Sequence, residues 1–138
     1  MPRRELTTVA PMSLTIGAVT FDSHDAAAQA AFWAAALGWE VAPDPSAELA
    51  MVGGPNRPAD APRLLFIQVP ERKSAKNRNH LDLHTVHLEA EVARLIELGA
   101  GLVHEKHEWD THWFTLADPE GNEFCVVEDQ LASADVPE

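Results

Sequence analysis

Apolar and polar positions repeat along the chain with two different periods, which separate predicted strands from predicted helices. Strands are predicted where apolar runs end at Gly, Pro, Asp or Asn, as in LTIGAVTF (14–21), RLLFIQVP (63–70) and EFCVVED (123–129). Helices are predicted at DAAAQAAFWAAALG (25–38), which is rich in alanine, and at LEAEVARLIELG (88–99), whose apolar residues share one face. Each helix ends at a glycine, the residue that most readily takes the left-handed conformation of a helix end.

The order of elements occurs twice. In each half a strand and a helix are followed by three strand segments, beginning with WEVAPDP (39–45) in the first half and GLVHEKH (101–107) in the second. Leu37-Gly38 corresponds to Leu98-Gly99 at an offset of 61 residues. Because each half alone would leave one sheet face bare, the halves are expected to pack together. The sequence therefore predicts an α+β fold, with two βαβββ modules forming one curved, partly closed eight-stranded sheet and the helices outside.

The predicted folded unit is one domain. The chain has 138 residues, the size of a single ordinary domain with one core. The modules are expected at 14–69 and 79–129, so that the domain runs over 14–129. Residues 1–13 and 130–138 lack periodicity and are predicted to be tails.

Composition and charge exclude several classes of partner. A formal net charge of −12 argues against nucleic acid, whose phosphates the chain would repel. No apolar run approaches the roughly 20 residues that span a bilayer, and the first residues have no apolar core of a secretory signal. The single cysteine, Cys125, excludes an internal disulfide and favours a cytoplasmic location. With nucleic acid and membrane disfavoured, a small molecule is the expected partner.

Positive charge is concentrated in one loop. Four of the ten Lys and Arg residues lie within seven positions, at Arg72, Lys73, Lys76 and Arg78. Such a loop is either an anion clamp over a cleft or a solvated segment, and the lack of a phosphate-binding motif favours the solvated segment.

The stretch HLDLH (80–84) contains the most specific side-chain pattern. Written as a strand, it directs Leu81 and Leu83 to one face and His80, Asp82 and His84 to the other. Residues four apart on a strand lie about 13 Å from each other and residues two apart about 6.6 Å. His80 and Asp82 are therefore close enough to share an ion or to act as an acid–base pair, whereas His80 and His84 are not. The simplest alternative is the polar face of a half-solvated strand.

Several segments together resemble one known family. They are VTFDSHDAAAQAAFWAAALGWE (19–40), HLDLH (80–84), VARLIELGA (92–100) and ADPEGNEFCVVE (117–128). With the duplicated module, they are similar to the vicinal oxygen chelate superfamily, the glyoxalase, bleomycin-resistance and dioxygenase group, and above all to its glyoxalase-like domain branch. The resemblance covers roughly 14–129. Its most specific piece is ADPEGNEF (117–124), a turn between two strands.

The resemblance implies a cleft on the concave sheet face, with four metal ligands in the metal-using members. The ligands come from the first and last strands of each module. The second-module His position matches His80, and the second-module Glu position falls at Cys125. The first-module His position falls at Ala18 or Val19, and the first-module Glu position falls in RLLFIQV, where Gln68 is the only ligand-like side chain.

This incomplete ligand set predicts a protein without a cofactor. A metal site needs at least three protein ligands. If a divalent metal does bind, we expect His80 to hold it together with Asp82 or Cys125. Cys125 and His80 also offer a nucleophile–base pair, although a single cysteine on a core strand is more often a buried apolar residue.

The expected ligand-binding residues are His80, Asp82, Cys125 and Gln68, with Trp113 or Phe114 on the cleft wall, where an aromatic ring can stack on a ligand. Two functions follow from the resemblance. One is the binding of a small molecule without chemistry, as in bleomycin-resistance members. The other is a lyase or isomerase resembling glyoxalase I, with His80 as acid–base group or metal ligand. Family analogy also predicts a homodimer.

The remaining histidines have no spacing of a known metal motif. His104, His107 and His112 surround the predicted hairpin at EWDT (108–111) and are expected to be exposed hairpin residues.

Overall fold

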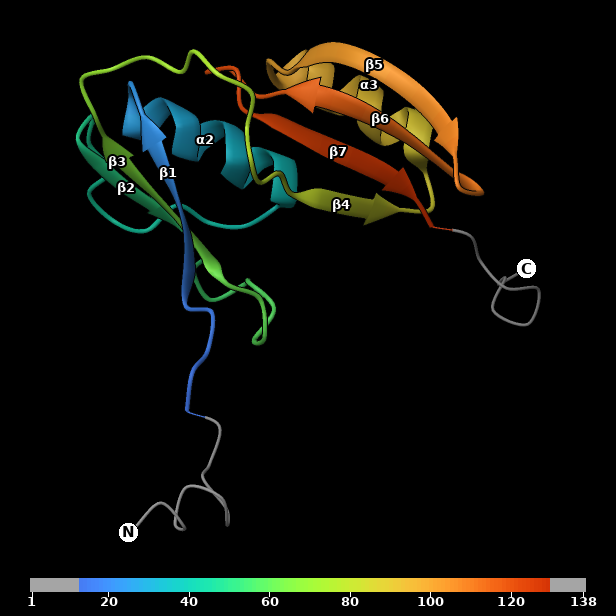
Figure 1. The fold of residues 1–138 in the computed structure, drawn as a ribbon. Coiled ribbons are helices and arrows are strands. Elements are labelled where there is room, and N and C mark those ends of the chain that lie inside the picture. The colour runs from blue at the N-terminus through green and yellow to red at the C-terminus, as the bar shows by residue number, and fades with distance from the viewer. Residues whose placement is uncertain (1–12, 130–138) are drawn as a thin grey trace, which may run out of the picture.

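The computed structural model describes residues 13–129, which form seven strands and two helices (Figure 1). The first half contains β1 (Ala18–Ser23), α2 (Ala26–Leu37), β2 (Leu49–Val52) and β3 (Arg63–Gln68). The second half contains β4 (Asp82–Thr85), α3 (Leu88–Leu98), β5 (Gly101–Glu108), β6 (Thr111–Ala117) and β7 (Glu123–Glu128). The predicted tails, apart from Ser13, lie outside the described residues. Neither helix of the described part is long and apolar enough to cross a membrane.

The predicted single eight-stranded sheet is wrong. The strands form two separate sheets, one of three strands in the order β1-β3-β2 and one of four in the order β4-β7-β6-β5 (Figure 1). WEVAPDP contributes only an isolated bridge between Val41 and Val52 instead of a strand. Pro43 and Pro45 have no N–H to donate to a ladder, and Asp44 between them has a φ of 63°. The first half therefore has one strand fewer than predicted.

The strand pairing shows the internal duplication that the sequence predicts. The first strand of each half pairs in parallel with the last strand of that half, β1 with β3 and β4 with β7. Strands β1 and β4 end at Ser23 and Thr85, and the helices that follow begin at Ala26 and Leu88, each pair 62 positions apart. On this spacing Ala18, and not Val19, occupies the position equivalent to His80.

Both helices end as their sequences predict. Asp25 caps α2 by accepting a hydrogen bond from the backbone N–H of Ala28 at 3.2 Å. Gly38 follows α2 in the left-handed conformation, with φ 72°. The side chain of Arg94 on α3 donates to the carbonyl oxygens of Ala35 and Ala36 at 3.1 and 2.8 Å, where a cation complements the C-terminal end of the α2 dipole.

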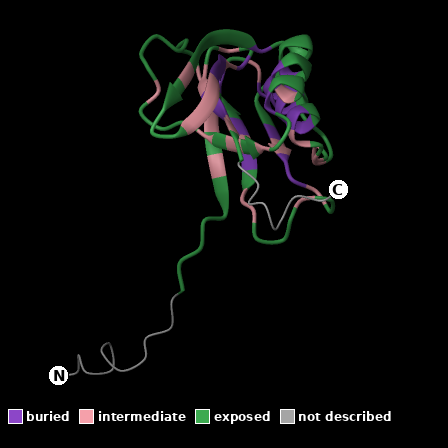
Figure 2. Ribbon diagram, turned by 90° about the vertical axis from the view of Figure 1, so that its right-hand side faces the viewer, coloured by how far each residue is buried: buried purple, intermediate pink, exposed green. Residues whose placement is uncertain are grey.

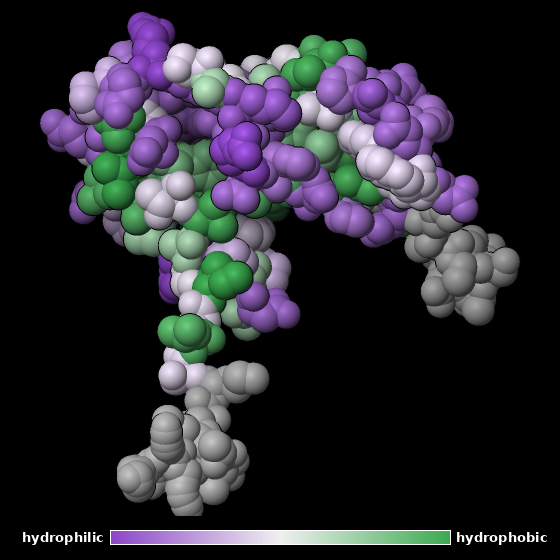
Figure 3. Space-filling view, in the orientation of Figure 1, coloured by the Kyte–Doolittle hydropathy of each residue, from purple (hydrophilic) through white to green (hydrophobic). Residues whose placement is uncertain are grey.

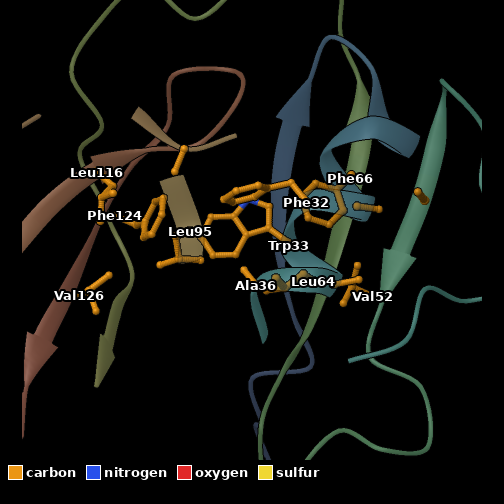
Figure 4. Close-up of a cluster of buried hydrophobic side chains, with 14 of the residues drawn as sticks. Phe32, Trp33, Ala36, Val52, Leu64, Phe66, Leu95, Leu116, Phe124 and Val126 are labelled. Carbon is orange, nitrogen blue, oxygen red and sulfur yellow. The ribbon is translucent and has the colours of Figure 1, made fainter. Parts of the chain in front are cut away.

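One aromatic side chain connects the cores of the two sheets. Trp33 on α2 is 1 % exposed, and its ring lies 5.6 Å from that of Phe21 on β1 and 4.9 Å from that of Phe124 on β7. Figure 4 shows Trp33 between Phe124 on one side and Phe66 on the other. Buried residues gather where helices face strands, and the outer helix faces are exposed (Figure 2). Side chains of α2 thus fill the space in which the two sheets were expected to join.

Candidate functional site

The HLDLH stretch has the alternation that its sequence predicts. Leu81 and Leu83 pack against the hydrophobic core, whereas His80, Asp82 and His84 are exposed. The His80 Nε2 atom lies 3.4 Å from an Asp82 carboxylate oxygen. His84 belongs to a separate pair, because its Nδ1 atom lies 2.8 Å from a carboxylate oxygen of Asp129.

The structure brings Cys125 to this pair. The parallel β4–β7 register sets Asp82 opposite Cys125, and one ligand atom from each of His80, Asp82 and Cys125 lies within 4.8 Å of the others. Cys125 is buried, and its Sγ atom lies 3.4 Å from the hydroxyl of Thr115 on β6. Burial raises the pKa of the Cys125 thiol, and the contact with Thr115 offsets this only in part. The thiol is therefore poorly suited to act as a nucleophile or as a thiolate ligand.

The two aromatic candidates on β6 lie on opposite faces of the sheet. Trp113 pairs with Val127, two residues from Cys125, so Trp113 and Cys125 share a face. Its ring stacks on that of Trp109 at 5.9 Å. Phe114 lies on the other face and packs against the core. Trp113 is thus the member of this pair that lies on the same face as Asp82 and Cys125.

Gln68 lies apart from the other predicted site residues. Its side-chain amide donates to the carbonyl oxygen of His24 at 2.9 Å, at the end of β3. Since Thr20 is equivalent to Asp82 and pairs with Leu65, the residue of the first half equivalent to Cys125 is Leu65.

The main cavity lies beside these residues. It has a volume of about 970 Å³ and is enclosed by β1, the β3–β4 loop and the turn between β6 and β7. Of the predicted ligand-binding residues only His80 lines it, whereas Asp82, Cys125, Gln68, Trp113 and Phe114 do not. The HLDLH pattern therefore identified one residue of the cavity wall, and the other walls come from segments to which the sequence assigned no ligand-binding residue.

The basic loop contributes directly to this cavity. Arg72, Lys73 and Arg78 all line it, and strongly hydrophilic residues follow the course of the β3–β4 loop on the molecular surface (Figure 3). No described residue forms an ion pair with Arg72 or Arg78. The loop is exposed, as expected, and its two arginines line the cavity without a direct ion-pair partner among the described residues, although the carboxylates of Asp22 and Glu71 also line it.

Two of the cavity's acidic residues are already engaged. The Glu120 carboxylate accepts hydrogen bonds from the backbone N–H groups of His24 and Asp25, at 2.6 and 2.8 Å. Glu123 pairs with Lys76 at 2.9 Å, and this hydrogen bond lowers the pKa of Glu123. Their charges are therefore partly satisfied within the protein, so the arginines have more influence on a ligand than a simple count of charges suggests.

A buried carboxylate holds the ADPEGN turn against α2. Asp118 is 3 % exposed and accepts hydrogen bonds from the side chains of Gln29 and Trp33 at 2.9 and 3.0 Å. It also accepts from the backbone N–H groups of Glu120 and Asn122, both at 2.9 Å. Sequence reasoning identified this segment only as a turn. The signal available in the sequence was an aspartate at the start of a turn, because such a side chain commonly accepts hydrogen bonds from backbone N–H groups within the turn.

Two packed α+β halves, each with parallel first and last strands and a cavity between them, define the vicinal oxygen chelate class. The chain belongs to the glyoxalase-like domain family, whose model matches residues 18–127. No curated protein matches the sequence at a significant level.

Solved structures show the same fold at low sequence identity. A glyoxalase/bleomycin resistance protein/dioxygenase family enzyme from Burkholderia phytofirmans has a TM-score of 0.65 at 16 % identity, covering 83 % of this chain and 98 % of its own. A glyoxalase-related enzyme from Fulvimarina pelagi has a TM-score of 0.64 at 14 % identity, with 88 % and 95 % covered. A lactoylglutathione lyase from Agrobacterium tumefaciens has a TM-score of 0.59 at 18 % identity, with 86 % and 95 % covered.

The metal set of the metal-using members does not fit this chain. The four equivalent positions hold Ala18, Leu65, His80 and Cys125, and the first two offer no donor atom. Asp82 lies near enough to replace one ligand, but a site with Cys125 requires a thiolate where burial favours the thiol. No catalytic step through a metal at this position follows from these residues.

Proposed function

We propose that this protein binds a small molecule that carries a carboxylate or phosphate group, in the cavity between its two halves. The observation that carries the proposal is the cavity of about 970 Å³ lined by Arg72 and Arg78. Guanidinium groups bind carboxylates and phosphates through paired hydrogen bonds, which are the stronger hydrogen bonds of proteins. Apolar residues of β1 and Phe124 line the opposite wall and suit the body of such a ligand.

A ligand-detected NMR screen tests this proposal. Small aliphatic and aromatic carboxylates and phosphates should show saturation transfer from the protein, and their matched neutral amides should show less. Arg78→Ala should weaken the affinity for the best hit by about tenfold, because it removes a charged hydrogen-bond donor. Ala18→Trp should abolish binding, since Ala18 is an exposed cavity-lining residue of β1 and the added indole fills the space.

Lys106→Ala is the matched control, because Lys106 lies on β5 outside the cavity lining. It removes one positive charge and should leave the affinity unchanged. Equal loss in the Arg78 and Lys106 variants would show that net charge, and not the cavity, decides binding. Hits that Ala18→Trp leaves intact would place the ligand elsewhere.

The alternative function is that of a lyase or isomerase, and the pairing of His80 with Asp82 supports it. His80 lines the cavity, and the carboxylate at 3.4 Å can hold its ring in position to accept or deliver a proton. A protein that only binds its ligand needs no such group.

His80→Ala separates the two functions. The His80 side chain is 45 % exposed, so the variant should keep its melting temperature within a few degrees. Under the binding proposal it loses affinity for the hit. Under the enzymatic alternative it loses turnover of the hit, followed by NMR over time, and largely keeps affinity. A large fall in melting temperature with unchanged binding would make His80 a structural residue.

We also propose a cytoplasmic homodimer, from the single cysteine and from the family resemblance. Exposed apolar side chains on β5, Leu102 at 55 % and Val103 at 45 %, offer a surface for a second copy. Light scattering coupled to size exclusion would measure the mass directly.

A further inference from the structure

A second group of metal-ligating side chains lies on the β5–β6 hairpin, away from the cavity. It consists of Glu105 and His107 on β5 and His112 on β6, with one ligand atom from each within 4.8 Å of the others. His107 and His112 are direct partners in the antiparallel register. His112 and Thr115 are three positions apart on β6, so they face opposite sides of the sheet, and Thr115 pairs with Cys125. The group is therefore separate from His80, Asp82 and Cys125.

We propose that Glu105, His107 and His112 bind a divalent first-row transition ion such as Zn²⁺. Two imidazoles and one carboxylate are a donor set that these ions accept, with water completing a tetrahedron. Ligand atoms about 2.0–2.2 Å from a tetrahedral ion lie roughly 3.3–3.6 Å from one another. The Glu105 carboxylate oxygen is 3.6 Å from His107 Nε2 and 2.8 Å from His112 Nε2. The first distance already suits a shared ion, and the second needs to open by only about half an ångström.

A neighbouring carboxylate prepares His112 for this role. An oxygen of Glu128 on β7 lies 3.5 Å from His112 Nδ1, while Nε2 faces Glu105. A proton on Nδ1 directed at Glu128 leaves the Nε2 lone pair for an ion, which is the arrangement that orients metal-bound histidines generally. The His112 side chain is only 17 % exposed and is held between two carboxylates.

His107 supplies the adjustable ligand. Its ring stacks on that of His112, with centroids 3.8 Å apart and planes inclined by 17°. An ion shared by two imidazoles lies near both ring planes, so one ring must turn away from this stack. The His107 side chain is 69 % exposed, and rotation about its terminal torsion meets little resistance.

The charge around the hairpin favours a cation. Glu105 and Glu128 both contact His112, and the chain as a whole carries a net charge of −12. Lys106 is the basic residue nearest in sequence. Alternation directs it to the other sheet face, where its amine lies 3.8 Å from a Glu108 oxygen. No lysine or arginine among the described residues pairs with either Glu105 or Glu128.

Cobalt titration tests the proposal on the full chain without an affinity tag, after treatment with EDTA. Co²⁺ replaces Zn²⁺ at such sites and reports its ligands by absorption. We expect saturation at about one ion per chain, visible d–d bands, and no thiolate-to-cobalt charge-transfer band. Zn²⁺ should displace the Co²⁺ and raise the melting temperature, because an ion that joins two strands binds the folded state alone.

Three substitutions and two controls locate the ion. His107→Ala and His112→Ala should abolish the cobalt bands, and Glu128→Gln should weaken the affinity by roughly 10- to 100-fold. His104→Ala is the matched control, because His104 pairs with Thr115 and so faces the other side of the same hairpin. Cys125→Ser controls for the other group. Both controls should bind Co²⁺ as the parent does.

Two results would overturn the proposal. One is a parent protein that shows no saturable cobalt binding. The other is a thiolate-to-cobalt band that Cys125→Ser removes and His107→Ala does not, which would place the ion at His80, Asp82 and Cys125. The first result does not bear on the ligand of the main cavity. The second would place an ion beside that cavity, at His80, and the carboxylate and phosphate screen with Arg78→Ala would still test the proposed function separately.

Discussion

Replacing Asp118 with alanine should lower the free energy of unfolding by about 3–5 kcal/mol, measured by urea denaturation. The carboxylate is 3 % exposed and is the common acceptor for the side chains of Gln29 and Trp33 and for two backbone N–H groups of its own turn. Each buried donor left without a partner costs about 1–3 kcal/mol. Asp118→Asn should also destabilise, since its amide N–H₂ must face at least one of these donors.

Asp60→Ala is the matched control. Asp60 is exposed in the loop between β2 and β3, so its loss should change the free energy of unfolding by no more than about 0.5 kcal/mol. If Asp118→Ala proved as mild as the control, the ADPEGN turn would hold its place through backbone conformation alone. The turn also carries Glu120, a wall residue of the cavity, so the variant should lose ligand affinity as well.

Replacing Trp33 with alanine should cost about 3–5 kcal/mol, the usual range for removal of a buried tryptophan. Trp33 is 1 % exposed, contacts Phe21 in the first half and Phe124 in the second, and donates its indole N–H to Asp118. The variant leaves a cavity at the point where the two halves meet and also removes one donor to the buried carboxylate. Urea denaturation followed by far-ultraviolet circular dichroism measures the loss.

The same experiment tests whether residues 14–129 form one domain. A single domain should unfold in one transition in the parent and in the variant, with the midpoint lowered. Two transitions in the variant would show that the halves are stable separately. Trp109→Ala provides the control, since Trp109 is 82 % exposed on the hairpin and its loss should leave the midpoint nearly unchanged. A double-mutant cycle with Asp118→Ala should show coupling, because the two side chains share a hydrogen bond.

Some residues of the cavity and of the hairpin could be predicted from the sequence, and others could not. His80 was found because the HLDLH segment, which ends in β4, has a strict alternation, and alternation is a local property. Arg72 and Arg78 were predicted to belong either to an anion clamp over a cleft or to a solvated loop, with the solvated loop favoured. Nothing in the sequence shows which way a long loop folds. Only the structure places them over β1, beside His80. The hairpin histidines were predicted to be exposed residues without a role, because His107 and His112 lack helical or finger spacing and meet only through strand register.

Local patterns by themselves determined much of this protein. The Gly38 and Gly99 helix termini, the inward leucines of HLDLH and the family all followed from residue types and their periods. These features depend on neighbours within a few residues, where side-chain sterics and backbone hydrogen bonding decide the conformation. Asp44 and its flanking prolines also disfavour a strand at WEVAPDP, although the prediction followed the apolar pattern of that segment.

Only the tertiary structure decided how the two halves meet. The sequence predicted one continuous sheet, and in the structure the edge strands β1 and β4 do offer free backbone groups through which two sheets can join. Instead Trp33 and its neighbours on α2 pack between the sheets. Burial of a large aromatic side chain there stabilises the fold. Hydrogen bonds between the two edge strands would add little, because water can satisfy the same backbone groups. The outcome depends on shapes and volumes contributed by residues far apart in the chain. Periodicity carries no record of those. Gln68 was named from the resemblance as the only ligand-like side chain of RLLFIQV, and the strand register instead gives Leu65 the equivalent position.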